Sequence, residues 1–321
     1  MRFNLNNPAF LQAGGNKPMI TRFVLTEISG DKVQLSANGL VIVEYLQDGE
    51  KVRNTYSALS DAYVSIPAGV EATIFGAVTA INSDENDNIF SMLDISKNTA
   101  LTYLNCNDCT VLTSLDVSNN TALTYLSCYG CTGLTSLDVS NNTALTYLRC
   151  GGTGLTSLDV SKNTALTYLN CNDCTVLTSL DVSNNTALTD LRCGITGLTS
   201  LDVSNNTALT YLGCSGTVLA SLDVSNNTAL TYLNCSGTGV MLLDIQNTAL
   251  LERGNLFQGI STNLTTLQVA GTSAWAYEQV ENWLNGDAPN DGKLYADENT
   301  PQEVITAATA KNWTVEYVDA A

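Results

Sequence analysis

The chain has 321 residues, of which 44% are hydrophobic and 14% charged, a composition typical of a folded globular protein. Its formal net charge of −18 excludes nucleic acid and makes anionic lipid a poor candidate partner, because both carry negative charge. There is no histidine, the commonest general base and metal ligand, and no apolar stretch of about 20 residues that would cross a membrane.

The first part of the chain predicts a small antiparallel β domain. We expect residues 1–20 to form a flexible segment, which has no apolar region typical of a secretion signal. Within residues 21–77, segments such as "TRFVLTEI", "LVIVEYLQ" and "EATIFG" alternate apolar and polar residues, and turn signals such as Asp48-Gly49 separate them. This period of two predicts strands, the last of which leads into the next region near Val78.

Residues 78–270 are dominated by a short internal repeat. The segment "LT-x-L" recurs every 21 or 22 residues, starting at Leu101, Leu123, Leu145, Leu166, Leu188, Leu209 and Leu230. This period lies in the range of leucine-rich repeats. In the first copy, Leu101, Leu104 and Cys106 have the spacing of a short strand whose apolar side chains point inward. One coil cannot bury these side chains alone, so the copies are predicted to stack into a solenoid.

The second half of each copy predicts the opposite wall of the coil. Leu112, Leu115 and Val117 repeat the inward spacing, and a coil this short leaves no room for a helix, so we expect extended or turn structure. A column of asparagines is predicted to bond neighbouring backbone across the coils: Asn98, Asn120, Asn142, Asn163, Asn185, Asn206 and Asn227.

Residues 271–321 predict an α/β cap. The segment "SAWAYEQVENWLNG" has Ser273 as a candidate N-cap, places Val280 and Trp283 near one face, and stops at Gly286. The segments "KLYAD", "TPQEVITAATAKN" and "WTVEYV" then predict strand, helix and strand. Because the open end of a solenoid has to be covered, we interpret this region as its terminal cap.

The repeat pattern L-x-x-L-x-C-x-x-(N/C)-x-L-x-x-L-D-V-S-x-N resembles the leucine-rich repeats of bacterial surface proteins, especially internalins with a cysteine ladder. The resemblance covers residues 93–245. It implies a mostly β leucine-rich repeat solenoid, between the small antiparallel β domain and the α/β cap described above. It also implies a protein at the cell surface or secreted, if an export signal precedes Met1.

The cysteines leave several chemistries to weigh. Seven form one column, and three more make C-x-x-C pairs with it: Cys106, Cys128, Cys150, Cys171, Cys193, Cys214 and Cys235, with Cys109, Cys131 and Cys174. Such pairs can bind zinc or act in redox chemistry. Disulfides are disfavoured because stacked parallel strands aim the Cβ vectors side by side. The extra cysteines occur only in 22-residue copies, which indicates loop packing. We therefore predict buried free thiols, with no metal and no cofactor.

Polar columns offer further alternatives. One consists of like charges stacked about 5 Å apart: Asp94, Asp116, Asp138, Asp159, Asp181, Asp202, Asp223 and Asp244. Calcium is one interpretation of this column, and hydrogen bonding to adjacent serine, threonine and backbone groups is the interpretation that we favour. The threonine column that includes Thr113 suggests ice binding, but such residues are favoured on any exposed β wall.

An aromatic column is the best candidate for function. It consists of Tyr103, Tyr125, Tyr147, Tyr168, Tyr211 and Tyr232, and is interrupted once by Asp190. These residues occupy outward strand positions, so they are predicted to line a concave face, where tyrosine is a favoured interface residue. Arg149 and Arg192 lie two residues beyond the tyrosine position. A purely structural row, in which the rings stack and shield the leucines, is the equally supported alternative.

The sequence therefore favours a non-enzymatic protein-interaction or adhesion module that binds a protein or glycan on another cell or assembly. The predicted ligand-binding residues are the six tyrosines with Arg149 and Arg192. The alternative is a structural or receptor-binding component of a phage tail or other surface assembly. It is suggested by the missing export signal and by the "AxAKxWTV" ending, which resembles the closing segment of some bacterial and phage-associated repeat proteins. An enzyme is the third hypothesis. We expect a monomer without membrane insertion and without a nucleic-acid partner.

Overall fold

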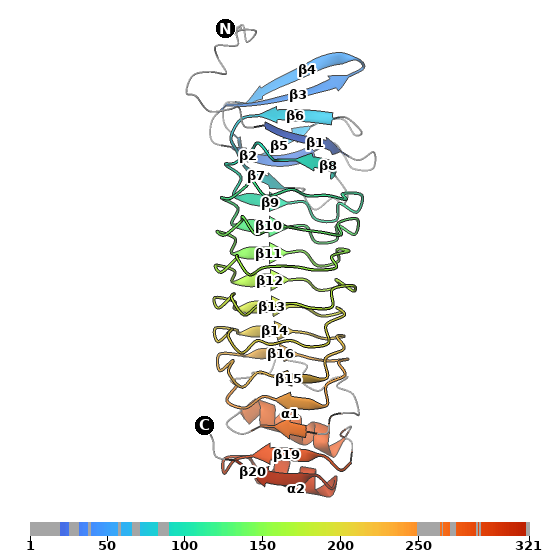
Figure 1. Ribbon diagram of the computed structural model, residues 1–321, viewed down its shortest axis with the longest axis vertical. Coiled ribbons are helices and arrows are strands. Elements are labelled where there is room, and N and C mark those ends of the chain that lie inside the picture. Colours follow the sequence, from blue (N-terminus) through green and yellow to red (C-terminus); the bar gives the residue numbers. More distant parts are fainter. Residues whose placement is uncertain are drawn as a thin grey trace.

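The computed structural model describes residues 20–25, 32–37, 40–56, 59–65, 71–82, 90–248, 264, 266–269, 274–286, 288 and 290–318. The molecule is a long column of stacked coils, with antiparallel strands at one end and two helices at the other (Figure 1). The predicted mostly β solenoid is therefore confirmed. The expected flexible segment, apart from Ile20, and the N-cap at Ser273 lie outside the described residues.

One side of the column is a parallel sheet of three-residue strands, which we call the strand wall. Its strands are β9 (Tyr103–Asn105), β10 (Tyr125–Ser127), β11 (Tyr147–Arg149), β12 (Tyr168–Asn170), β13 (Asp190–Arg192), β14 (Tyr211–Gly213) and β16 (Tyr232–Asn234). Adjacent strands pair in register, so that Leu126 lies between Leu104 and Leu148. The central leucine of each strand is fully buried, whereas the residue before it is half-buried on the outer face, as the alternation of a strand requires.

The opposite side, which we call the second wall, carries the Leu-Asp pairs of each coil. Leu115 and Val117 are buried in the first complete coil, while Ser114 and Asp116 are exposed. As predicted, the backbone here is extended or turned, and residues 90–248 contain no helix. Regular strands occur only towards its ends: β8 (Phe90–Asp94), β15 (Ser221–Asp223) and β17 (Leu242–Asp244).

The N-terminal strands continue both walls of the solenoid. They are β1 (Ile20–Leu25), β2 (Lys32–Ala37), β3 (Val41–Gln47), β4 (Glu50–Tyr56), β5 (Leu59–Ser65), β6 (Glu71–Phe75) and β7 (Val78–Asn82). The strand wall extends through β7 to β2 and β5, whereas β8 of the second wall joins an antiparallel sheet in the order β4-β3-β6-β1-β8. The predicted antiparallel region is present, and its two sheets cover the first coil.

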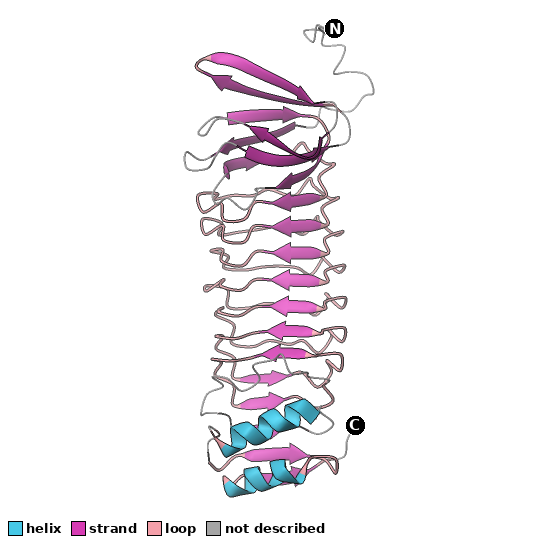
Figure 2. Ribbon diagram, turned by 180° about the vertical axis from the view of Figure 1, so that it is seen from behind, coloured by secondary structure: helices cyan, strands magenta, loops and turns pink. Residues whose placement is uncertain are grey.

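The C-terminal region forms the expected strand–helix–strand cap. Its elements are β18 (Thr266–Gln268), α1 (Ala274–Asn285), β19 (Lys293–Ala296), α2 (Gln302–Ala310) and β20 (Thr314–Tyr317). The strands prolong the second wall in the order β15-β17-β18-β19-β20, and both helices lie on the side of the strand wall (Figure 2). Trp283 of α1 and Trp313 pack edge to face, with ring centroids 5.5 Å apart. These helices bury apolar surface where the strand wall ends.

A buried asparagine ladder links the coils inside the turns. Asn142 Nδ2 donates to the carbonyls of Val117 and Asn120 in the preceding coil, at 3.0 and 2.9 Å. Equivalent pairs of bonds recur from Asn120 to Asn227, so the ladder predicted from the sequence is confirmed. These bonds satisfy backbone carbonyls that are buried away from water.

Neither helix in the part of the chain that the structure describes has the length and apolar character needed to cross a membrane.

Candidate functional site

The tyrosines of the strand wall form a stack of rings. In-register pairing places them on neighbouring strands, and a threonine before each ring ties its strand to the previous coil, as when Thr146 Oγ1 donates to the carbonyl of Thr124 at 3.1 Å. Ring centroids of neighbours from Tyr103 to Tyr168 are 4.2, 4.4 and 4.2 Å apart, with interplanar angles of 12°, 9° and 3°. Tyr211 and Tyr232 stack in the same way at 4.1 Å.

Asp190 and Arg192 fill the interruption in the tyrosine row. Arg192 donates from Nε and Nη2 to the two carboxylate oxygens of Asp190, both at 2.9 Å. Its guanidinium lies 4.5 Å from the ring centroid of Tyr211 and 5.5 Å from that of Tyr168. The hydrogen bonds with Asp190 raise the pKa of Arg192. The planar guanidinium thus replaces the missing ring, and its charge is balanced within the row.

Arg149 has a partner that the sequence did not reveal. Its guanidinium carbon lies 3.9 Å from the ring centroid of Tyr129, a residue of the turn that follows β10. This is the geometry of a cation–π contact. Tyr129 occurs in only one copy of the repeat, so no column pointed to it. Both predicted arginines therefore lie along the strand wall, but each is held by neighbouring side chains.

The phenol groups are hydrogen-bond donors at neutral pH. Burial and then the neighbouring tyrosines raise the pKa of Tyr147 well above its usual value, and burial together with Tyr232 raises the pKa of Tyr211 to about 12. Each ring is half-buried, and the faces of the inner rings are covered by their neighbours. The row therefore presents ring edges and hydroxyls to solvent.

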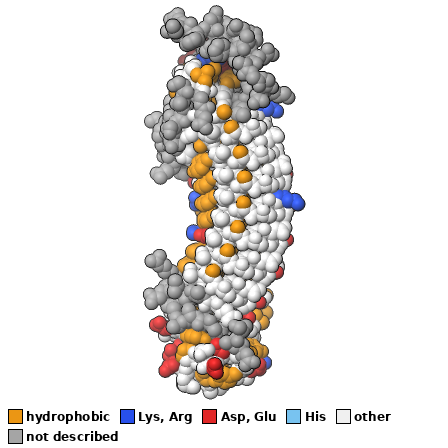
Figure 3. All heavy atoms as spheres, turned by 90° about the vertical axis from the view of Figure 1, so that its left-hand side faces the viewer, with side chains coloured by type: hydrophobic (Ala, Val, Ile, Leu, Met, Phe, Trp, Pro, Cys, Tyr) orange, Lys and Arg blue, Asp and Glu red, His pale blue; other side chains and the backbone are white. Residues whose placement is uncertain are grey.

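In side view the column curves gently, and hydrophobic side chains gather in a line along its hollow edge, on the side of the strand wall (Figure 3). At the 4.8 Å spacing of strands, the tyrosine positions extend over roughly 30 Å. The row carries one charged pair, Asp190 and Arg192, on a chain whose formal net charge is −18. The strand wall is thus a long surface of low charge on an acidic protein.

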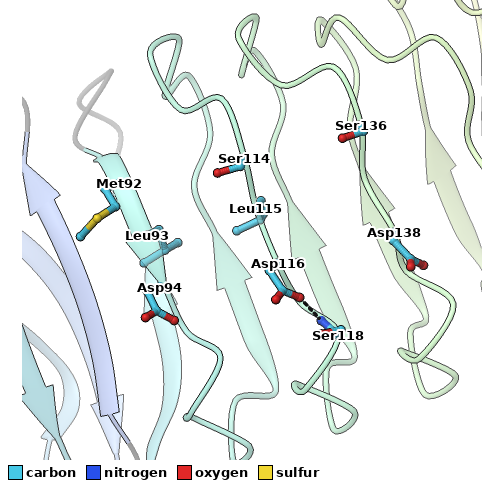
Figure 4. Close-up of a pocket in the computed structure, with 9 residues that line it drawn as sticks. All are labelled: Met92, Leu93, Asp94, Ser114, Leu115, Asp116, Ser118, Ser136 and Asp138. Carbon is cyan, nitrogen blue, oxygen red and sulfur yellow. Dashed lines mark hydrogen bonds between the residues drawn. The ribbon is translucent and has the colours of Figure 1, made fainter.

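The aspartates of the second wall are bound within their own coils. Asp116 Oδ1 accepts a hydrogen bond from the backbone N–H of Ser118 at 2.9 Å (Figure 4). The same two-residue turn recurs along the column from Asp94 to Asp244. Bonds from serine lower the pKa of Asp116 and its equivalents in the next four coils, and the neighbouring aspartates oppose this effect on Asp116. The favoured hydrogen-bonding interpretation agrees with this geometry.

Two shallow depressions on the second wall are lined by serines and aspartates of successive coils, one around Asp116 and the other around Asp181. Figure 4 shows Asp94, Asp116 and Asp138 side by side on neighbouring coils. Across the part of the chain that the structure describes, no three histidine, cysteine or acidic side chains are grouped so that they could hold a metal ion.

All ten cysteines are free and buried in the core. Burial raises the pKa of Cys128 well above its usual value, which keeps this thiol protonated and unreactive. Cys131 Sγ donates to the carbonyl of Cys106 at 3.0 Å, so an extra cysteine of a 22-residue copy serves to bond the neighbouring turn. The cysteine columns are thus part of the packing between the walls.

No protein-family model and no curated protein matches the sequence. The similar solved structures include the functional domain of InlJ from Listeria monocytogenes, which includes a cysteine ladder, with 27% identity and a TM-score of 0.35. That match covers 69% of this chain and 65% of the InlJ domain, so the chain spans less than two thirds of its length.

Two further matches are more distant. The internalin InlF from Listeria monocytogenes is 22% identical over 60% of this chain and 81% of its own, with a TM-score of 0.29. The leucine-rich repeat ectodomain of the receptor kinase GASSHO1/SCHENGEN3 from Arabidopsis thaliana is 14% identical over 69% of this chain and 32% of its own, with a TM-score of 0.34. The repeats, the stacked parallel strands and the buried cysteine column make the present chain a leucine-rich repeat solenoid with a cysteine ladder.

Proposed function

We propose that this chain is a non-enzymatic interaction module whose strand wall binds a protein ligand along the tyrosine row. The observation that carries the proposal is the continuous line of phenol groups and one guanidinium, in register over seven coils. Half-buried tyrosines combine apolar area with a polar tip and lose little side-chain entropy on binding, because stacking already fixes their rings.

The stacking favours a protein ligand over a glycan. A sugar ring packs against an open aromatic face, and the inner rings of this row use both faces on each other. A polypeptide needs only ring edges for apolar contact, with hydroxyls and guanidinium N–H groups that donate to its carbonyls. Arg192 has three N–H groups beyond the two that bond Asp190, so one central position retains donors for a ligand.

The proposal is tested with two probes, a displayed library of random twelve-residue peptides and an array of immobilised glycans. We expect peptides to be enriched on the folded chain and to lose about tenfold or more in affinity when Tyr125, Tyr147 and Tyr168 are changed together to phenylalanine. Phenylalanine keeps the stacking and removes three donors, each worth about 1 kcal/mol. Tyr317→Phe is the matched control, because Tyr317 is exposed in the cap. Glycan binding, or the absence of any enriched peptide whose binding the triple change weakens, contradicts the proposal.

A further inference from the structure

A second surface lies along the turns that follow the strand wall. In every copy one residue of this turn has positive φ, between 53° and 72°: Asp108, Gly130, Gly152, Asp173, Ile195, Gly216 and Gly237. The residues of this column are stacked in register, since Ile195 N donates to the carbonyl of Ser215 and Gly216 N to that of Ser236, both at 2.7 Å. Glycine and aspartate tolerate this left-handed conformation, whereas a β-branched residue in it is a true outlier.

Ile195 strains the backbone without a compensating contribution to the core. Its φ is 53°, and 53% of its surface is exposed. Its Cγ1 lies 3.3 Å from the place that a Cβ would take at Gly216, so the side chain rests on the glycine of the next coil and leaves its outer side in solvent. Strained residues of this kind gather at functional sites. We therefore look for a contact with another molecule that offsets the backbone strain of Ile195.

Two exposed valines occupy the later part of this turn in the coils before and after Ile195. Val176 in the coil before and Val218 in the coil after are 50% and 59% exposed, and Gly197 lies between them in the coil of Ile195. Val218 N donates to the carbonyl of Leu198 at 3.1 Å, which places it beside the turn that contains Gly197. Three exposed apolar side chains thus lie within three successive coils, a span of about 10 Å.

Charge indicates the chemistry of the occupant. Asp173 precedes Ile195 in the column by one coil and donates its backbone N–H to the carbonyl of Gly194 at 2.9 Å. Among the described residues, no hydrogen bond or ion pair engages its carboxylate. With a formal net charge of −18 on the chain, this edge attracts cations and repels acidic groups.

We propose that Asp173, Val176, Ile195 and Val218 form a docking site, the turn-edge patch, for a protein segment with an apolar side chain next to a lysine or arginine. The apolar side chain covers Ile195 between the two valines, and the basic group pairs with Asp173. The patch lies beside the strand wall and does not depend on ligand binding there.

The test uses the same displayed library of random twelve-residue peptides. We expect a class of enriched peptides that pairs apolar with basic residues and loses at least tenfold in affinity for Ile195→Gly. Glycine is the residue of four other copies at this position, so the change removes strain and raises the melting temperature. If Ile195 served only to stabilise the fold, the same change would instead lower the melting temperature. Asp173→Asn keeps a residue that tolerates positive φ. Because it removes the charge, it is expected to weaken peptide binding and to make the affinity depend less on salt concentration.

The matched control is Val111→Ser. Val111 is 51% exposed in the first copy, where Asp108 occupies the positive-φ column, but no exposed isoleucine or valine follows it in the next coil. Affinity for this variant should be unchanged, whereas Val176→Ser together with Val218→Ser should reduce it. The proposal is overturned if no apolar and basic peptide is enriched, or if such peptides bind Ile195→Gly as tightly as the unchanged chain. Peptides sensitive only to the tyrosine changes would support the strand-wall function and overturn the turn-edge patch.

Discussion

The two walls of the column repeat with the same period, but the interactions between equivalent side chains of neighbouring coils are opposite in sign. On the strand wall, like side chains attract across coils, because tyrosine rings stack at 4.2 Å. On the second wall, like charges repel across coils, and each aspartate is stabilised by the turn of its own coil. A repeat therefore strengthens an aromatic column by cooperation between coils, whereas an acidic column needs compensation in every copy.

The largest expected effect comes from the core that both walls share. Leu169→Asp buries an unpaired charge at a fully buried position between the walls and is expected to cost several kcal/mol, on the order of 3–5, or to prevent folding. Thr164→Asp, an exposed change in the same coil, should cost less than about 1 kcal/mol. Denaturant unfolding of both variants measures the difference. Equal effects would contradict the inward and outward assignment.

The asparagine ladder is expected to follow. Asn185→Ala removes two bonds to buried carbonyls, those of Val160 and Asn163 at 3.0 and 2.9 Å, and should cost roughly 2–4 kcal/mol. The adjacent Asn184 is exposed, so Asn184→Ala is the control and should change stability by less than about 0.5 kcal/mol. Similar melting temperatures for the two variants would show that the ladder contributes little.

The tyrosine stack gives a smaller effect that depends on position. Tyr147 has two stacked neighbours and Tyr232 has one among the described residues. At about 0.5–1.5 kcal/mol for each pair, Tyr147→Ala should cost about 1–3 kcal/mol in stacking, and Tyr232→Ala about half as much. The corresponding phenylalanine variants should be nearly neutral. Equal losses at the two positions would argue against cooperation along the row.

The smallest expected effects are in the pH dependence of the second wall. The pKa of Asp116 is lowered by Ser118, so its contribution to stability is present above the unfolded pKa of 3.8 and is lost as pH falls through the folded value. Burial raises the pKa of Asp244 to about 6, which reverses the sign. The contribution of Asp244 to stability is therefore present below the unfolded pKa of 3.8, and it is lost as the pH rises through about 6. Asp244→Asn should therefore flatten the melting-temperature profile between pH 4 and 6, and an unchanged profile would contradict the assignment.

The sequence predicted those features that the repeat imposes on every coil. Leu104, Cys106 and Asn120 recur at fixed spacing, and stacking forces equivalent residues into columns, so the walls, the buried thiols and the asparagine ladder followed directly. Features of single copies were not predictable. The guanidinium of Arg192 enters the row through its side-chain conformation, and the contact of Arg149 with Tyr129 joins positions that belong to no column.

The sequence pattern also did not predict how the N-terminal strands join the two walls. Alternation in β1 and β2 predicted strands, but their partners are distant in sequence, such as β8 for β1 and β7 for β2. A period of two shows that a strand exists and does not specify which strand it pairs with. The left-handed conformation of Ile195 was hidden for a related reason, because the turn type follows from the neighbouring copies and not from isoleucine itself.

The central claim is that the strand wall, and not the second wall, binds the ligand. The most direct test takes an enriched peptide that binds Ile195→Gly as tightly as the unchanged chain, and compares its affinity for Gly213→Gln and for Ser200→Gln. A Cβ at Gly213 meets only the ring of Tyr211, at 3.4 Å, so glutamine fits there and covers the row beside Arg192. Ser200 is exposed on the second wall. We predict at least a tenfold loss for Gly213→Gln and no change for Ser200→Gln, and the reverse result would contradict the claim.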